Sequence, residues 1–191
     1  MFYQSTADAG LAQPPAVVEA LETESRGDLD FQALLMGLIA RESAWNPGAL
    51  RAEPHIGDAS YGLCQVLLGT ARLFEPAVTP SDLFIPAVNI RIGAAFLRDK
   101  VRQYGVEDGV SAYNAGRPVS GNRGYVADVL AYRDFYRHAI VPGTVAPEFF
   151  GDEQLWGDGV PQPASNGWGG AAGLGVGAAA LVAVLLLARR G

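Results

Sequence analysis

One short segment limits the fold more than any other, because its apolar side chains recur at the spacing of a helix. They are Phe31, Leu34, Leu35, Leu38 and Ile39. The segment follows Asp28 and Asp30, which are residue types that cap a helix N-terminus, and it stops before Asn46-Pro47-Gly48. The pattern predicts an amphipathic core helix that runs to about residue 44.

The rest of the sequence also favours helices. No stretch of useful length alternates apolar and polar residues as a half-buried strand does, so the expected fold class is mainly α. Residues 46–62 are rich in Gly, Pro, Asp and Ser and are expected to form a loop. Further helices are expected over Gly62 to Phe74, Pro86 to Tyr104, Val110 to Ala115 and Tyr125 to Ala139. In the longest of these, the side chains expected to face inward are Val88, Ile92, Ala95, Phe96 and Val101.

The C-terminal part of the sequence carries an apolar run of membrane length. The twenty residues 169–188 contain no charged side chain, and Arg189-Arg190 follow them. Twenty helical residues span the roughly 30 Å of a bilayer core, so this run is predicted to be a transmembrane helix. The alternative is a flexible Gly/Ala tail, because five glycines fill its first half.

The 191 residues are enough for one domain with a hydrophobic core and a tail. The start of the chain lacks the basic and apolar stretches of a secretory signal peptide. The expected division is a mobile arm over 1–28, a folded domain over 29–140, a Pro/Gly/acidic linker over 141–168, the transmembrane segment over 169–188 and a basic end over 189–191.

The charge and the metal-binding residue types exclude some classes of function. Fourteen basic against twenty acidic residues give a net charge of −6, which argues against nucleic acid as a partner. The single cysteine, Cys64, cannot form an internal disulfide. With His55 and His138 it makes no metal-ligand cluster, so neither a metal nor a cofactor is expected.

Glu42 is the first candidate for chemistry. It lies eleven positions after Phe31, a spacing that returns to nearly the same helical face, so it continues the apolar stripe. A carboxyl in an apolar wall has a raised pKa and can hold a proton near neutral pH, as a general acid must. The alternative is a glutamate at a helix end that faces solvent or pairs with Arg41 or Arg51.

Several short motifs carry a family resemblance. In order they are Glu42-Ser43, Ser60-Tyr61-Gly62-Leu63-Cys64-Gln65, Pro86-Ala87-Val88-Asn89-Ile90, Ala112-Tyr113-Asn114-Ala115-Gly116 and Gly124-Tyr125-Val126. This order resembles that of the soluble lytic transglycosylase family, whose domain is lysozyme-like and helical. The resemblance covers about residues 31–137 and makes 29–140 the expected catalytic domain.

The resemblance implies a role for each matching residue. Glu42 matches the catalytic acid/base of the family. The implied substrate-binding residues are Ser43, Gly62, Gln65, Tyr113, Asn114 and Tyr125. Cys64 stands where the family has methionine and is expected to pack rather than react. The sequence departs from the family at Gly121-Asn122, where a Glu-Thr pair is frequent.

The implied reaction is cleavage of the bond between N-acetylmuramic acid and N-acetylglucosamine in peptidoglycan strands, with formation of 1,6-anhydromuramic acid. Two alternatives stay open. One is a hydrolysing muramidase of the same fold, in which Asp58 or Glu53 supplies a second carboxylate. The other is an inactive glycan-binding structural protein.

A wall-cleaving domain with a C-terminal membrane helix and no signal peptide suggests delivery from outside the cell. The favoured location is therefore a bacteriophage virion, either in a virion membrane or injected into the host envelope, where the enzyme would open the wall locally. The alternative is the bacterial cell envelope. Besides glycan strands and a membrane, other virion or envelope proteins are the expected partners.

Overall fold

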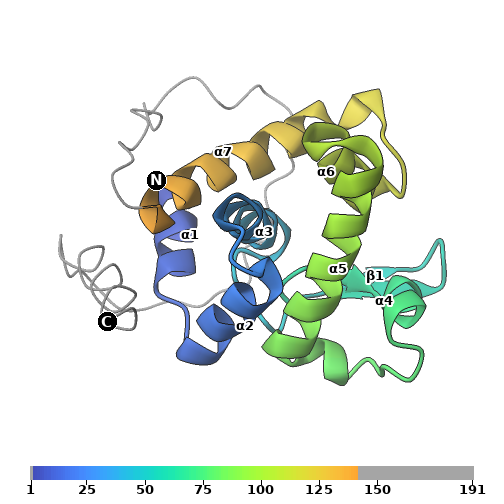
Figure 1. Ribbon diagram of the computed structural model, residues 1–191. Helices are drawn as coiled ribbons and strands as arrows, with labels where there is room; N and C mark the ends of the chain where they lie inside the picture. Colours follow the sequence, from blue (N-terminus) through green and yellow to red (C-terminus); the bar gives the residue numbers. More distant parts are fainter. Residues whose placement is uncertain (1, 142–191) are drawn as a thin grey trace.

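Helix α3 (Leu29–Ser43) lies at the centre of the molecule, and other helices surround it (Figure 1). The structure, a computed structural model, describes residues 2–141 of the chain. Ten successive residues of α3, from Phe31 to Ala40, are buried. The helix is therefore enclosed on all sides and is not amphipathic as expected, because almost every side chain in this stretch is apolar.

The surrounding helices agree with most of the helical segments expected. They are α1 (Phe2–Leu11), α2 (Pro15–Ser25), α4 (Leu68–Phe74), α5 (Pro86–Tyr104), α6 (Val106–Ala115) and α7 (Arg123–Ile140). Two 3-10 turns, η1 (Asp82–Phe84) and η2 (Ser120–Asn122), precede α5 and α7. The bounds of α5 are those predicted. Its most buried apolar residues are Ile90, Ile92, Ala94 and Leu97, while Val88, Phe96 and Val101 are only partly buried against the core.

The N-terminal residues expected as a mobile arm form α1 and α2 instead. Val17 and Leu21 of α2 are almost fully buried, and α2 packs against α3 and α5. Pro14 is the N-cap of α2 and Pro15 its first residue, because proline fits the first turn of a helix. At α1, Gly10 lies against Trp45 and Tyr136, and the Trp45 indole donates to the Tyr136 hydroxyl at 2.8 Å.

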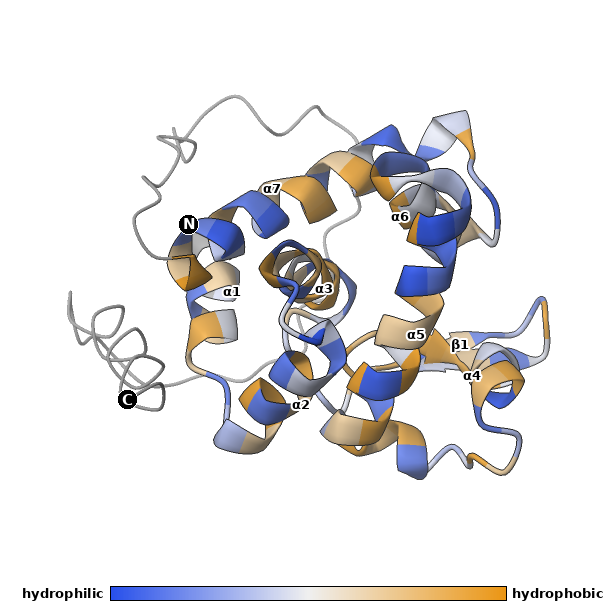
Figure 2. Ribbon diagram, viewed as in Figure 1, coloured by the Kyte–Doolittle hydropathy of each residue, from blue (hydrophilic) through white to orange (hydrophobic). Residues whose placement is uncertain are grey.

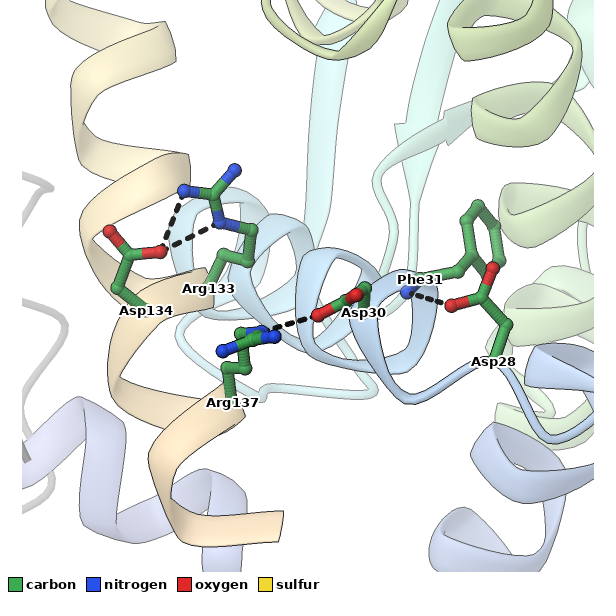
Figure 3. A network of polar contacts seen from close by, with 6 residues as sticks. All are labelled: Asp28, Asp30, Phe31, Arg133, Asp134 and Arg137. Atoms are coloured by element: carbon green, nitrogen blue, oxygen red, sulfur yellow. Dashed lines mark hydrogen bonds and ion pairs between the residues drawn. The ribbon is translucent and has the colours of Figure 1, made fainter. Parts of the chain in front are cut away.

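Helices α3 and α7 lie against each other at short backbone distance. Gly37 permits this, since a Cβ there would lie 2.6 Å from the Val129 carbonyl oxygen. The residues of α7 buried in the core are Val129, Tyr132 and Tyr136, and hydrophobic and hydrophilic segments alternate along its ribbon (Figure 2). At the start of α3, the Asp28 side chain caps the helix by accepting from the Phe31 N–H at 2.9 Å, and Arg137 of α7 pairs with Asp30 (Figure 3). Exposed pairs of this kind add little stability, so packing holds the two helices together.

A small antiparallel sheet projects beside the helices (Figure 1). Its strands follow in the order β1 (Leu50–Glu53), β2 (Asp58–Tyr61) and β3 (Val66–Leu67). Residues 46–62 are therefore not a simple loop, and only the second part of 62–74 is helical. The sequence signal was missing because these strands are very short and β1 is mostly exposed, so no burial alternation marks them.

The predicted linker, the predicted transmembrane segment over 169–188 and the basic end lie outside the described residues. Within residues 2–141, no helix combines the length and the apolar character that a bilayer span requires.

Candidate active site

A pocket of about 380 Å³ lies between the sheet and the C-terminal end of α6, and Glu42 of α3 contributes to its wall. On the sheet side its lining includes Arg51, Glu53 and Ser60. On the helical side it includes Phe96 of α5 and the α6 end. The full lining is Glu42, Arg51, Glu53, His55, Ile56, Ser60, Gln65, Val66, Leu67, Thr70, Phe96, Tyr113, Asn114, Ala115 and Gly116.

The Glu42 carboxyl is held by a tyrosine from α7. The Tyr125 hydroxyl donates to Glu42 Oε1 at 2.5 Å, although 83 positions separate the two residues. Burial raises the pKa of Glu42, while the Tyr125 hydrogen bond and the charges of Arg41 and Arg51 lower it. Burial also raises the pKa of the Tyr125 phenol, and the Glu42 charge adds to this. Tyr125 therefore stays a neutral donor, and Glu42 has the raised pKa that a general acid needs.

Arg41 stands beside this pair without entering the pocket lining. Its Nε lies 2.9 Å from Asp128 Oδ2, and its guanidinium lies 5.4 Å from the centre of the Tyr125 ring. The ion pair with Asp128 ties the end of α3 to α7 close to Tyr125. The alternative of a Glu42 paired with Arg41 or Arg51 is not what the structure shows, since the Glu42 carboxyl accepts from Tyr125, whereas Arg41 pairs with Asp128 and Arg51 with Glu53.

A buried asparagine of α5 organises the turn between β2 and β3. Asn89 is fully buried; its Oδ1 accepts from the Cys64 N–H at 2.7 Å. Its Nδ2 donates to the carbonyls of Tyr61 and Leu83 at 2.8 and 2.9 Å. Sequence analysis quoted Asn89 within a motif but gave it no role. A lone amide among the apolar residues of a helix is the signal that could have identified it, because a buried amide requires partners.

Gly62 and Gln65 shape this turn. Gly62 has φ 68°, and a Cβ there would collide with the Leu83 carbonyl oxygen and come within 2.5 Å of Asn89 Nδ2. Gln65 also has a positive φ, 46°, and its side-chain amide donates to the carbonyls of Gly62 at 3.0 Å and Ala49 at 3.2 Å. Gln65 lines the pocket, whereas Gly62 lies behind it and permits its shape.

Tyr113 and Cys64 connect α6 to the same turn. The Tyr113 hydroxyl donates to the Cys64 carbonyl at 2.8 Å, and its ring packs on Phe96 with centroids 4.8 Å apart. Cys64 is fully buried against Gly93, and burial raises the pKa of its thiol far above the usual range. The thiol is therefore a packing group, as expected, and not a nucleophile.

Asn114 lies at the exposed end of the pocket, and Asn122 holds it. Asn122 Nδ2 donates to Asn114 Oδ1 at 3.0 Å and to the Ser111 carbonyl at 3.3 Å. Asn122 belongs to the pair Gly121-Asn122, at which the sequence departs from the family pattern. In this chain the departure supplies a hydrogen bond to Asn114.

Ser43 is the one implied binding residue whose side chain turns away. Its hydroxyl donates to the Ile39 carbonyl of its own helix at 3.2 Å, and Ser43 is absent from the pocket lining. Of the remaining residues, Gln65, Tyr113 and Asn114 line the pocket with Glu42. Gly62 and Tyr125 are not in the lining; Tyr125 bonds to Glu42, and Gly62 lies against Asn89.

The two carboxylates considered for a hydrolase differ in position. Asp58 accepts from the backbone N–H groups of Ala59 at 2.7 Å and Gly69 at 2.8 Å and does not line the pocket. Glu53 does line it, and its Oε1 lies 2.7 Å from Arg51 Nε. Within the described residues, no group of three or more potential ligands is arranged to hold a metal ion.

The sequence of the chain is similar to that of a known family of proteins. The model of the transglycosylase SLT domain matches residues 21–125. Soluble lytic murein transglycosylases from Salmonella typhimurium and Escherichia coli are 31% and 33% identical to the chain over 65% and 56% of its length. The matches span only 23% and 21% of those relatives.

A solved structure shows the same likeness. It is the lytic transglycosylase Slt of Pseudomonas aeruginosa, 25% identical, with a TM-score of 0.51 over 62% of this chain and 23% of that one. That protein was solved as an inactive mutant in which a glutamate is replaced by glutamine.

Proposed function

Because the chain belongs to the transglycosylase SLT domain family, we propose that it is a peptidoglycan lytic transglycosylase with Glu42 as its catalytic acid/base. The observation that carries the proposal is the Glu42 carboxyl in the pocket wall, with a raised pKa and a hydrogen bond from Tyr125. The names of the relatives and the inactivity of a glutamate-to-glutamine variant of one of them support it.

In the first half of the reaction, Glu42 acts as a general acid. Its proton passes to the glycosidic oxygen between N-acetylmuramic acid and N-acetylglucosamine, and the bond from that oxygen to the muramic anomeric carbon breaks. The N-acetylglucosamine end leaves with a free hydroxyl. Glu42 is now a carboxylate that Tyr125 stabilises by donating its hydrogen bond.

In the second half, the same carboxylate acts as a base. Glu42 takes the proton of the muramic 6-hydroxyl, whose oxygen attacks the anomeric carbon and closes the 1,6-anhydro ring. Glu42 is protonated again and no water is consumed. One carboxyl is therefore sufficient for the cycle, provided that it is held in one place, and Tyr125 supplies that restraint.

The remaining pocket residues are proposed to bind the glycan. Gln65 and Asn114 offer amide groups for sugar hydroxyl and acetamido groups, and Tyr113 supplies an aromatic wall beside Phe96. Gly62 keeps the turn close to α5. For Ser43 the support is weaker than for the others, because its hydroxyl bonds to its own helix.

The hydrolysing muramidase is the alternative reaction. It needs a second carboxylate to attack or to activate water. Asp58 is held by two backbone N–H groups outside the pocket lining, which argues against it. Glu53 lines the pocket but is paired with Arg51, so it is the candidate that this reaction would use.

Product analysis tests the proposal. The full chain is incubated with purified peptidoglycan, and the released muropeptides are identified by mass spectrometry. The full chain is used because α2 packs on α3 and α5. Products ending in 1,6-anhydromuramic acid are expected. Reducing-end muramic acid, heavier by one water, would instead indicate the hydrolase, and no release at all would indicate a binding or structural role.

The Tyr125→Phe variant is expected to change the pH profile in a defined direction. The Tyr125 hydrogen bond lowers the pKa of Glu42, so its loss raises that pKa further. Glu42 must be protonated for the first step and loses its proton as the pH rises through its pKa. The high-pH limb of kcat/KM is therefore expected to move to higher pH, while kcat falls on the order of tenfold because the carboxyl is held less firmly.

Tyr104→Phe is the matched control for this variant. Tyr104 ends α5, is partly exposed and does not line the pocket, so its profile should follow that of the wild type. A Tyr125→Phe profile with an unmoved or lowered high-pH limb would contradict the assignment of that limb to Glu42.

Membrane attachment is a separate proposal that rests on the uncharged run over residues 169–188 and on the arginines after it. The full chain is expected to float with lipid vesicles in a density gradient, and a chain ending at residue 168 is expected to remain at the bottom. Equal flotation of both chains would contradict the proposal. Delivery from a bacteriophage virion stays a prediction, because none of the relatives named above is named as a phage protein.

A further inference from the structure

The inference concerns the face that the β1–β2 hairpin turns toward the pocket. Side chains two positions apart on a strand point to the same side, and Arg51 and Glu53 of β1 both line the pocket. Their neighbour across the ladder is Ser60 of β2, which pairs with Arg51 in the register and is also part of the lining. This face stands in the same pocket as Glu42.

The Arg51 side chain is oriented but not fully used. Its Nε lies 2.7 Å from Glu53 Oε1. The Glu53 side chain is only 16% exposed, so this ion pair restricts the position of the arginine. The Arg51 side chain is 64% exposed. Within residues 2–141, its two terminal amino groups donate no hydrogen bond to another residue. The guanidinium is therefore ion-paired with Glu53 and still largely exposed, and the two terminal amino groups of an arginine can bind a carboxylate through two hydrogen bonds.

The charges of the other pocket residues make Arg51 the site where an anionic ligand would bind. Besides the Tyr113 phenol, whose pKa burial raises, the ionisable groups of the lining are Glu42, Arg51, Glu53 and His55, so Arg51 is its one permanent cation. Glu53 and, during the reaction, Glu42 carry negative charge toward the substrate and would repel an anionic ligand. Arg51 lies close enough to Glu42 for its charge to lower the pKa of that carboxyl. An anionic strand therefore has one place in the pocket where its charge is favoured.

We propose that Arg51 binds the free lactyl carboxylate of muramic acid and so makes the enzyme selective for glycan strands without stem peptides. This rests on the proposed function, which puts a muramic acid beside Glu42 and hence within the same pocket as Arg51. In a strand without peptides each lactyl group ends in a carboxylate. In a peptide-bearing strand the same group is an amide, which has no charge for Arg51 to bind.

Binding measurements test the selectivity apart from the chemistry. The Kd of soluble strands is measured by calorimetry with the full chain carrying Glu42→Gln, so that no turnover occurs. The probes are peptide-free strands, the same strands with the lactyl carboxylates converted to methylamides, and peptide-bearing strands. Adding Arg51→Met is expected to raise the Kd of the peptide-free strands about tenfold and to change the Kd of the methylamide strands less than about twofold.

Glu53→Gln in the same background is the companion variant, and its expected effect has the opposite sign. It keeps an oxygen for Arg51 Nε but removes the competing negative charge, so the Kd of the peptide-free strands should fall. The methylamide strands should respond to neither variant. Thermal unfolding of both variants serves as the control for folding.

Three results would overturn the inference. They are an equal effect of Arg51→Met on charged and methylamide strands, no effect on either, or a tenfold effect on peptide-bearing strands, which would move the bound carboxylate to the peptide. Failure of the proposed function would look different. In that case the chain with Glu42 intact would release no anhydro product from peptidoglycan or from peptide-free strands, whatever the pattern of Kd values.

Discussion

Glu42→Gln is expected to abolish release of 1,6-anhydro products, lowering kcat by about 10²- to 10⁴-fold, the range in which general acid–base groups contribute. Glutamine keeps the size of the side chain and an oxygen that can accept from Tyr125, but it has no proton to give to the glycosidic oxygen. Both halves of the proposed cycle use this one carboxyl, so the substitution removes acid and base together. Muropeptide release followed over time measures the loss.

The same substitution is expected to leave the fold intact and to raise its stability at neutral and alkaline pH. Burial raises the pKa of Glu42 in the folded protein above its ordinary value. The folded state then binds the proton more tightly than the unfolded state, so ionisation above that pKa costs folding free energy. Glutamine removes this cost at high pH and makes no difference in acid, where the carboxyl is protonated in both states. Melting temperatures from pH 4 to pH 9 show whether this is so.

Glu22→Gln is the matched control. Glu22 is an exposed residue of α2, so neither activity nor the pH dependence of stability should change. A Glu42→Gln protein that retained more than about a tenth of the activity would contradict the single-carboxyl mechanism. A variant that lost activity together with stability at every pH would point to a structural role for Glu42.

Gly62→Ala is expected to have the second large effect, a destabilisation of about 3 kcal/mol with loss of most activity. The backbone at Gly62 has φ 68°, where a Cβ is unfavourable, and the added Cβ would also meet the Leu83 carbonyl and Asn89 Nδ2. Asn89 would have to move, and it is the residue that holds the Cys64 N–H and the Tyr61 carbonyl. Denaturant unfolding measures the stability of the variant, and muropeptide release measures its activity.

Gly57→Ala separates the two causes. Gly57 lies between β1 and β2 with φ 66°, nearly the same backbone conformation, but a Cβ there meets nothing within 4 Å. Its expected cost is therefore only the conformational one, about 1 kcal/mol. If both glycine variants lost the same stability, the contact between Gly62 and Asn89 would not be what restricts this position to glycine.

Sequence analysis predicted the helices better than it predicted the rest of the fold. The bounds of α5 are those expected, and α3 and α7 differ by a residue or two at their ends, because long apolar periodicities reflect local geometry. It did not predict the hairpin over residues 50–61, since its two strands have only four residues each and β1 is mostly exposed, so they leave no alternation to detect. It also did not predict the packing of α2, whose Leu21 is buried only because α3 and α5 lie beside it.

For the site, a carboxylate in an apolar stripe and the order of the motifs pointed to seven residues, of which Glu42, Gln65, Tyr113 and Asn114 line one pocket in the structure, while their roles stay predictions. The sequence could not show that Ser43 turns back to its own helix, nor that Asn122 bonds to Asn114. It assigned no role to Asn89 and considered Arg51 only as a possible partner of Glu42. Each of these contacts depends on which groups lie within hydrogen-bonding distance after folding. The spacing of two residues along the chain does not give the distance between them in the folded protein.

By itself, then, the sequence determined the helical character of the chain, the burial of α3 through its apolar composition and the presence of a carboxyl at the end of that helix. Only the tertiary structure decided what this carboxyl can do. Tyr125 reaches Glu42 from 83 positions away, and the pocket closes around it from α6 and from the hairpin. Helix formation depends on neighbours within one turn, whereas the pKa of Glu42 depends on burial and on charges that distant segments bring to it.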